Sequence, residues 1–312
     1  MPEGENVHYL NNVQDAIGNT PILRINHMDI PNGNRIYAKM ELSNPGGSIK
    51  DRVGMYMIAD AERRGVLKPG YTIVEATAGN TGIGLAMAAL NRGYKLKFIV
   101  PTKFSHEKLA IMRALGAEIV NTPREEGMLG AERYMNKLLK KDRTCISMSQ
   151  FHNKANPLAH YETTGPEIYR DLDGHVDYFV AGAGSGGTFS GIVRYLKERD
   201  PSIKGVLSDP VGSTIGGGTH SDYDIEGIGN DFVADTMDMS LVDKVIKVRD
   251  SDAMDTVREL ARKEGVLAGT SSGAALWASL KLAEEVKDKD IVTIFPDRGE
   301  RYFTKGVWGP MD

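Results

Sequence analysis

The segment Asn44-Pro-Gly-Gly-Ser-Ile-Lys50-Asp-Arg52 decides the fold of this 312-residue chain. Its proline and two glycines predict a turn that runs directly into a helix. Ser48 is predicted to cap that helix, and Asp51, three residues later, completes a capping box. Lys50 then lies in the first helical turn, where the positive end of the helix dipole disfavours an ammonium. The position therefore favours the neutral, nucleophilic amine of Lys50. A solvated surface lysine is the alternative.

Downstream of this segment, short β-branched runs alternate with longer helical patterns. Such alternation predicts an α/β protein with mostly parallel sheets and helices on both faces. The expected strands are 22–25, 36–40, 72–76, 96–100, 118–121, 145–148, 178–181, 203–208, 244–248 and 291–295. The expected helices run from 50 to about 65 and over 83–91, 105–115, 129–140, 188–199, 252–264 and 273–286. A composition break at 152–157 indicates a crossover between domains, and the glycine-rich stretch 210–235 is predicted to be a functional loop.

Composition excludes several classes of protein. Lys plus Arg is 38 and Asp plus Glu is 42, so the net charge of −4 argues against nucleic acid as the main partner. The single cysteine, Cys145, can form neither an intrachain disulfide nor a structural zinc site, and it fits a reducing cytoplasm. Residues 1–12 lack the apolar core of a signal peptide, and no apolar run is long enough to span a membrane.

A glycine-rich loop, Gly182-Ala-Gly-Ser-Gly-Gly-Thr188, follows a predicted strand and opens a predicted helix. Free N–H groups at such a helix start bind phosphate. The spacing of Gly182, Gly184 and Gly187 also satisfies the dinucleotide fingerprint, with Asp209 placed to bind a ribose. Taken alone, this loop favours a nicotinamide cofactor. A role in packing only is a further alternative.

Two more loops stand between a strand and a helix. Thr77-Ala-Gly-Asn-Thr-Gly82 offers hydroxyls, an amide and backbone N–H groups, which suit a carboxylate. Gly269-Thr-Ser-Ser-Gly273 offers a hydroxyl that can donate to an unprotonated pyridine nitrogen. Helix capping would explain either loop by itself. Together with Lys50, the three loops favour a Schiff base between that lysine and pyridoxal phosphate (PLP).

Other chemistry has little support. The seven histidines show no metal-ligand spacing. His106 at a helix start and His160 on a helix are predicted to be surface residues. No G-x-S-x-G elbow is present, which argues against serine hydrolysis.

These motifs, in this order, resemble those of the cysteine synthase and cystathionine β-synthase family, PLP enzymes of the tryptophan-synthase-β fold (fold type II). Gly18-Asn-Thr-Pro21, Gln150-Phe151, Asn156-Pro157 and Glu226-Gly-Ile-Gly229 match as well. The likeness runs from about Asp15 to Lys305 and is closest to the bacterial branch that uses O-acetylserine. The resemblance implies two domains with the cofactor in the cleft between them. The larger, phosphate-binding domain would comprise 1–40 and 154–312, and the smaller, mobile, substrate-binding domain 41–153.

The resemblance also implies a role for each matched residue. Lys50 is the Schiff-base lysine and later the proton-transfer base, and Asn80 bonds the cofactor's ring hydroxyl. Ser271 faces the pyridine nitrogen. The phosphate is held by Gly184, Ser185, Gly186, Gly187 and Thr188. The substrate is bound by Thr77, Ala78, Gly79, Thr81, Gln150 and Gly227.

The implied reaction is β-replacement on O-acetylserine, in which acetate leaves and a sulfur nucleophile adds. Many cysteine synthases carry serine at the position of Ala78, whereas the alanine form resembles a branch that takes homocysteine and makes cystathionine. Sulfide as acceptor, giving cysteine, stays open, and so does serine as donor. The expected protein is a cytoplasmic homodimer and transferase of cysteine biosynthesis and transsulfuration, without haem or S-adenosylmethionine regulation. A nicotinamide-dependent dehydrogenase and a non-catalytic relative are the alternatives.

Overall fold

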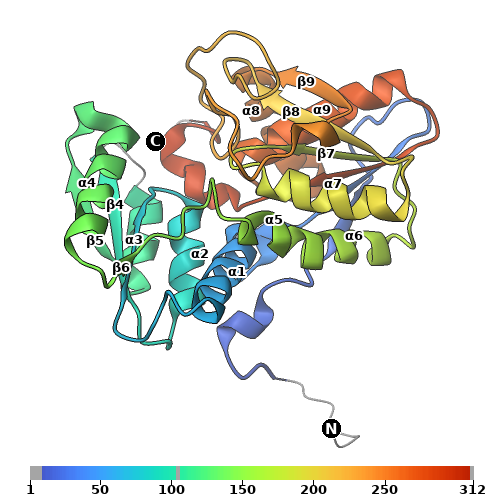
Figure 1. Ribbon diagram of the computed structural model, residues 1–312. Helices are drawn as coiled ribbons and strands as arrows, with labels where there is room; N and C mark the ends of the chain where they lie inside the picture. The colour runs from blue at the N-terminus through green and yellow to red at the C-terminus, as the bar shows by residue number, and fades with distance from the viewer. Residues whose placement is uncertain (1–8, 103–105, 310–312) are drawn as a thin grey trace, which may run out of the picture.

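Two sheets organise the chain in the computed structural model, which describes residues 9–102 and 106–309. The larger sheet has six strands in the order β1-β2-β10-β7-β8-β9, and the smaller has four in the order β5-β4-β3-β6. Only the β1–β2 pair is antiparallel among the strand pairs of the described residues. Figure 1 shows the smaller sheet beside α4 and the larger sheet beside α7 to α9. The prediction of an α/β protein with two mostly parallel sheets is confirmed.

The strands are β1 (Ile22–Ile25), β2 (Arg35–Lys39), β3 (Thr72–Ala76), β4 (Lys95–Pro101), β5 (Glu118–Thr122), β6 (Cys145–Ile146), β7 (Tyr178–Gly182), β8 (Lys204–Pro210), β9 (Lys244–Val248) and β10 (Asp290–Ile294). The α-helices are α1 (Lys50–Arg63), α2 (Asn80–Ala89), α3 (His106–Ala114), α4 (Gly127–Lys141), α5 (Ala155–Ala159), α6 (Gly165–Asp171), α7 (Gly187–Arg199), α8 (Asp250–Glu264) and α9 (Thr270–Glu285). Two further helical segments bear on the site, the π-helical η4 (His160–Thr164) and the 3-10 helical η6 (Gly299–Lys305).

Each sheet is covered on both faces by apolar helix faces. Helices α8 and α9 pack on one face of the larger sheet, and α6 and α7 pack on the other. On the smaller sheet, α1, α2 and α3 share one core around Phe98, and α4 covers the opposite face at Val74 and Ile99. The parallel strands therefore direct their carboxyl ends, and the loops that follow them, toward one edge of each sheet.

The segment 155–171 departs from the expectation. The prediction places His160 on a helix but gives no helix bounds in this segment, which forms α5, η4 and α6 in succession. The predicted loop 210–235 begins at the last residue of β8, and residues 211–235 form no helix or strand. Two predictions concern parts of the chain outside the described residues. These parts are residues 1–8 and 310–312 of the predicted larger domain and the side chain of His106. The domain boundaries at 41 and 153 stay a prediction.

Within the described residues, no helix combines the length and the apolar character needed to cross a bilayer.

Candidate active site

The turn that carries Lys50 is fixed to the end of the larger sheet. Ile49 N donates to Pro296 O at 2.8 Å, and Ser48 forms an antiparallel bridge with Asp297. On the other side, Gly54 and Gly84 allow α1 and α2 to touch through their backbones. A Cβ on Gly84 would overlap the carbonyl of Lys50, and one on Gly54 would overlap the carbonyl of Gly84. The position of Lys50 is thus set by β10 and α2 together.

The pKa of the Lys50 amine is shifted in the direction that a nucleophile requires. Burial lowers its pKa to about 8, and the charge of Asp297 opposes that shift. The predicted capping box is wrong, however. The residue that caps α1 is Ile49, which makes no side-chain cap, while Ser48 Oγ accepts from Lys50 N at 3.2 Å. Asp51 turns away from Ser48 and accepts from Gly46 N at 2.6 Å, because the tight glycine turn presents that N–H to it.

Asn80 and Lys50 meet through Asp297 and the C-terminal segment. Asn80 begins α2, and its Nδ2 donates to Asp297 Oδ2 at 2.7 Å. Arg301, in η6, donates to Asn80 Oδ1 and to the carbonyl of Gly46. Figure 1 shows this C-terminal segment running from the larger sheet toward the side of the smaller one. The chain's last turns therefore hold the two loops that carry Lys50 and Asn80.

The second loop brings its predicted substrate ligands together. Thr81 Oγ1 donates to Gln150 Oε1 at 2.7 Å, although the two residues are 69 positions apart. Gly79 N lies 3.4 Å from Thr77 Oγ1, and nothing lies within 4 Å of where a Cβ of Gly79 would be. Ala78 is buried in the core of the smaller sheet. Hydroxyl, amide and backbone groups thus surround open space, which suits a small carboxylate.

The glycine-rich loop at the start of α7, the anion loop, has the backbone arrangement that an anion requires. Gly186 has a φ of 78°, a left-handed conformation that favours glycine. Among the described residues, no hydrogen bond is made by the N–H groups of 185–189, and these groups stand at the positive end of a 13-residue helix. Thr236 Oγ1 donates to Ser185 O at 2.5 Å, and Asn230 Nδ2 donates to Gly184 O at 2.8 Å. These bonds fix the loop through its carbonyl groups and leave its N–H groups available to a ligand.

Asp209 does not serve the dinucleotide interpretation. Its Oδ2 is engaged by Lys247 Nζ at 2.5 Å and by Gly216 N at 3.0 Å. Its Oδ1 is buried without a partner among the described residues, and Asp209 is 0% exposed, so neither carboxylate oxygen is presented to a ribose. The glycine loop therefore favours a simple phosphate.

Asn156 joins the carboxylate loop to the anion loop. Its Nδ2 donates to Gln150 O and to Ser185 Oγ, each at 2.9 Å, while its Oδ1 is buried without a partner among the described residues. Gly187 faces it so closely that a Cβ there would overlap Asn156 Oδ1. Sequence reasoning quoted Asn156 as part of a motif but gave it no role.

The start of α9, which carries Ser271, is bonded to the loop that carries Gly227. Ser271 is buried in the first turn of α9. Thr270 Oγ1 accepts from Glu226 N at 3.0 Å, which ties that turn to the loop of Gly227. Gly227 is exposed, has a φ of 87° and borders open space, and a Cβ on Gly184 would lie 2.6 Å from its carbonyl oxygen. Beside it, Glu226 pairs with Lys108 at 2.6 Å and Lys305 at 2.9 Å.

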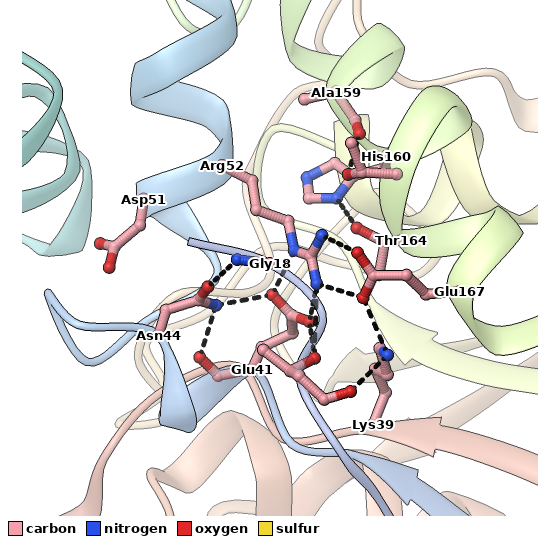
Figure 2. Close-up of polar contacts among 12 residues, drawn as sticks. Gly18, Lys39, Glu41, Asn44, Asp51, Arg52, Ala159, His160, Thr164 and Glu167 are labelled. Atoms are coloured by element: carbon pink, nitrogen blue, oxygen red, sulfur yellow. Dashed lines mark hydrogen bonds and ion pairs between the residues drawn. The ribbon is translucent and has the colours of Figure 1, made fainter. Parts of the chain in front are cut away.

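A buried ion network beneath Lys50 was not predicted. Figure 2 shows Arg52 between Glu41 and Glu167, with Lys39 on the far side of Glu167. Arg52 Nε donates to Glu41 Oε2 at 2.8 Å, and Arg52 Nη1 donates to Glu167 Oε1 at 2.6 Å. Lys39 Nζ lies 2.9 Å from Glu167 Oε2. Arg52 is two residues beyond Lys50 on α1, so the network anchors that helix to β2, η2 (Glu41–Ser43) and α6.

His160 is not the surface residue that was predicted. It is fully buried, because the helical path of 155–171 turns it inward toward α7. Its Nδ1 pairs with Thr164 Oγ1 at 2.9 Å and its Nε2 with Thr188 Oγ1 at 3.2 Å. Burial, with the charges of Lys50 and Arg52, lowers the pKa of His160 well below 6.5, so the ring is neutral.

Comparison with known proteins identifies the family. The model of the family described as "Pyridoxal-phosphate dependent enzyme" matches residues 13–297. This chain belongs to that family.

Two curated relatives are similar over almost their whole length. One is an O-acetylserine dependent cystathionine beta-synthase of Bacillus subtilis (strain 168), 48% identical over 96% of this chain and 98% of that protein. Another is a cysteine synthase of Helicobacter pylori (strain ATCC 700392 / 26695), 44% identical over 95% of this chain and 98% of that protein. A crystal structure of an O-acetylserine dependent cystathionine beta-synthase from Helicobacter pylori superposes with a TM-score of 0.91 at 44% identity, covering 96% of this chain and 99% of that one. The predicted family and its fold type II architecture are confirmed.

The residues of the site fit PLP, the cofactor of this enzyme family. The free N–H groups of 185–189 match a phosphate dianion, and the lowered pKa of Lys50 matches a covalent attachment point. Within the described part of the chain, no group of three or more His, Cys, Asp or Glu could hold a metal ion. A hollow of about 920 Å³ beside α1, α5 and α7 is lined by none of the predicted site residues.

Proposed function

We propose that this enzyme catalyses β-replacement on O-acetylserine, releasing acetate and adding a sulfur nucleophile. Homocysteine as nucleophile gives cystathionine, and sulfide gives cysteine. One observation carries the proposal: the Thr81–Gln150 pair is joined through Asn156 to the anion loop at Ser185. A carboxylate site and a phosphate site at fixed separation are what an amino-acid substrate and PLP require. The names of the relatives in Bacillus subtilis and Helicobacter pylori support the same reaction.

PLP, when bound, withdraws electrons from the amino acid and makes its Cα proton acidic. Lys50 would hold the cofactor through Nζ and would later take the Cα proton at the same atom. Its lowered pKa favours the neutral amine that both tasks need. Asn80 Nδ2 would donate to the ring hydroxyl, and Ser271 would donate toward the ring nitrogen without adding a charge.

The remaining site residues would bind the cofactor's phosphate and orient the substrate. The N–H groups of the loop from Gly184 to Thr188 bind the cofactor's phosphate, with the side chains of Ser185 and Thr188 beside them. The substrate carboxylate lies against Thr77, Gly79, Thr81 and Gln150, next to the buried methyl of Ala78. Gly227 leaves open space beside the substrate for the incoming nucleophile.

The acceptor is expected to be homocysteine as well as sulfide. Ala78 lacks the hydroxyl that serine would supply to the carboxylate loop, and one missing hydrogen bond costs about 0.5–1.5 kcal/mol. Such a loss still permits the first half of the reaction. The exposed edge at Gly227 has room for a nucleophile longer than sulfide, and Lys108 and Lys305 give that edge a positive excess over Glu226. These features support acceptance of an amino-acid thiol.

The test is product analysis with O-acetylserine and equal concentrations of homocysteine and sulfide. Cystathionine is expected as a main product beside cysteine. Ala78→Ser is the matched variant, and it is expected to tighten donor binding by up to about tenfold. Rapid cysteine formation without cystathionine would leave the alternative, a cysteine synthase that uses sulfide only. Replacing O-acetylserine by serine in the same assay tests the donor.

The assembly and the compartment are expectations of the same proposal. A homodimer in the cytoplasm, without nucleic acid or membrane as a partner, is what the family resemblance implies. Light scattering of the purified holoenzyme coupled to size exclusion tests the first point, and it should give twice the 34.1 kDa of the chain.

A further inference from the structure

Asp297 lies where three loops of the site meet. It follows β10 and pairs across an antiparallel bridge with Ser48, two residues before Lys50. Its backbone carbonyl accepts from Gly269 N at 3.1 Å, at the start of α9. Its side chain is 1% exposed and accepts from Asn80 Nδ2. One residue thus contacts the lysine turn, Asn80 and the helix that carries Ser271.

The two carboxylate oxygens of Asp297 differ. Oδ2 accepts from Asn80 Nδ2 and from Tyr302 Oη, each at 2.7 Å. Oδ1 is buried and has no hydrogen-bond partner among the described residues. It lies against Gly269, where a Cβ would overlap it. A buried charged oxygen without a partner is costly, so a carboxylate at this point is not explained by stability alone.

The charge of Asp297 favours the ammonium form of Lys50 and opposes the effect of burial. Other ionisable groups on the elements that form these loops are Asp51 in α1, His160 in η4, and Arg301 and Tyr302 in η6. Asp51 is held by Gly46 N, and burial raises its pKa to about 7. Burial keeps His160 neutral by lowering its pKa. Burial and Asp297 raise the pKa of Tyr302 well above 10, so it stays a donor.

Asp297 and Arg301 also fix the direction of the Asn80 amide. A guanidinium only donates, and Arg301 donates to Asn80 Oδ1. Asn80 Nδ2 is therefore the atom turned to Asp297, and it is the donor that the ring hydroxyl of the cofactor needs. An amide rotated by 180° would lose both contacts.

We propose that Asp297 is a positioning residue for the reaction, whose carboxylate stabilises the ammonium form of Lys50 and orients the amide of Asn80. The inference rests on the proposed role of Lys50. When the Cα–H bond breaks, the proton goes to Lys50 Nζ and the electron pair stays on Cα. That pair then forms the Cα=Cβ double bond while the Cβ–O bond breaks, and acetate leaves with the electrons of the broken bond.

The first test measures Lys50 in the apoenzyme, without any activity. Brief competitive acetylation over a pH series, followed by peptide mapping, gives the titration midpoint of Lys50. Removal of the negative charge in Asp297→Asn should move that midpoint down by about one pH unit, since a nearby opposite charge shifts a pKa by this order or more. An unchanged or raised midpoint in the folded variant overturns the proposal.

Two further variants separate charge from packing. Asp209→Asn removes another buried carboxylate of the larger sheet that also has one unpartnered oxygen, but its partner is Lys247. It should leave the Lys50 midpoint at the wild-type value even if the protein melts earlier. Should Asp297→Asn fail to fold, Asp297→Ser, which is smaller and also uncharged, gives the same comparison.

In the holoenzyme, Asp297→Asn should lower kcat about tenfold and change KM for the donor much less, because the lost interaction acts in proton transfer. Equal changes in kcat and KM would contradict the role in positioning. Borohydride reduction of the wild type and peptide mapping provide the separate check on Lys50. A label on another lysine would refute the proposed function, whereas a label on Lys50 with an unmoved midpoint would refute only the role of Asp297.

Discussion

Arg52 and Glu167, 115 positions apart in sequence, form a bidentate ion pair in the interior, with Nη1–Oε1 and Nη2–Oε2 distances of 2.6 and 2.7 Å. Burial alone would raise the pKa of Glu167, but the hydrogen bonds and charges of Arg52 and Lys39 lower it to about 2. The carboxylate is therefore ionised at neutral pH. Arg52 is two residues beyond Lys50 on α1, and its pair with Glu167 ties α1 to α6 (Figure 2).

Loss of Arg52 should lower the free energy of unfolding strongly. Arg52→Met leaves the buried carboxylates of Glu41 and Glu167 without their main partner, which costs about 3–5 kcal/mol. Arg63→Met on the same helix is the matched control, because the Arg63–Asp60 pair is exposed and such pairs contribute about 1 kcal/mol or less. Urea unfolding followed by circular dichroism measures both. Equal losses in the two variants would show that the buried network contributes no more than a surface pair.

The close backbone contact between α1 and α2 leads to a second prediction. In Gly84→Ala the new methyl overlaps the carbonyl of Lys50, and backbone cannot move aside as a flexible side chain can. Overpacking of this kind costs about 1–3 kcal/mol and shifts the helices, so Lys50 and Asn80 should move apart. The expected result is a lower melting temperature together with weaker PLP retention on dialysis. Gly65 follows the end of α1, and a Cβ there meets no atom within 4 Å. Gly65→Asn is the control, because asparagine tolerates the left-handed φ of 70° at this position.

Much of this architecture could be predicted from local sequence signals. The strands 22–25 and 244–248 were predicted with the bounds that the structure shows, because turn residues flank compact β-branched runs. The loop at Gly184 was identifiable because glycines between a strand and a helix have few other uses. Asn80 and Thr81 stood out in the same way, as polar residues at a helix start.

The parts that were missed depend on contacts between distant residues. The helices of 155–171 lack an apolar stripe, because His160, Thr164 and Glu167 turn polar groups inward to partners on other elements. The contacts of Asp297 and Arg301 with Asn80 have no local sequence signal, because these residues are 217 and 221 positions from Asn80. The cap predicted at Ser48 is wrong for a local reason, because Asp51 accepts from Gly46 N and does not complete a capping box.

The anion loop should not tolerate a carboxylate. In Gly186→Asp a negative group and extra bulk enter the loop where charge-assisted bonds to phosphate are worth about 1.5–3 kcal/mol each. PLP binding, followed by absorbance and by equilibrium dialysis, should be lost. Gly265→Asp is the control, because Gly265 has a similar φ of 72°, ends α8 and borders open space. Full PLP occupancy in Gly186→Asp would show that the phosphate is bound elsewhere.

The pH dependence of cofactor attachment follows from Lys50. Its pKa is lowered by burial from 10.5 to about 8, so the neutral amine dominates above pH 8. The rate at which the apoenzyme attaches PLP should fall about tenfold per pH unit below 8 and level off above it. An ordinary lysine would give that break near 10.5 instead. Lys50→Ala should bind PLP through the anion loop without attachment and should lose turnover.

The same shift fixes how Lys50 changes stability with pH. Between pH 8 and 10.5 the unfolded chain binds more protons at this lysine than the folded one does, so the free energy of unfolding should rise with pH across that window. Below pH 8 the cost of burying the ammonium is present in full. Urea unfolding of the wild-type apoenzyme and of Lys50→Ala at pH 7.0 and 9.5 tests this, because the substitution removes the titrating group. The difference in stability between the two proteins should therefore move in favour of the wild type at the higher pH, and a difference that stays constant would show that Lys50 titrates alike in both states.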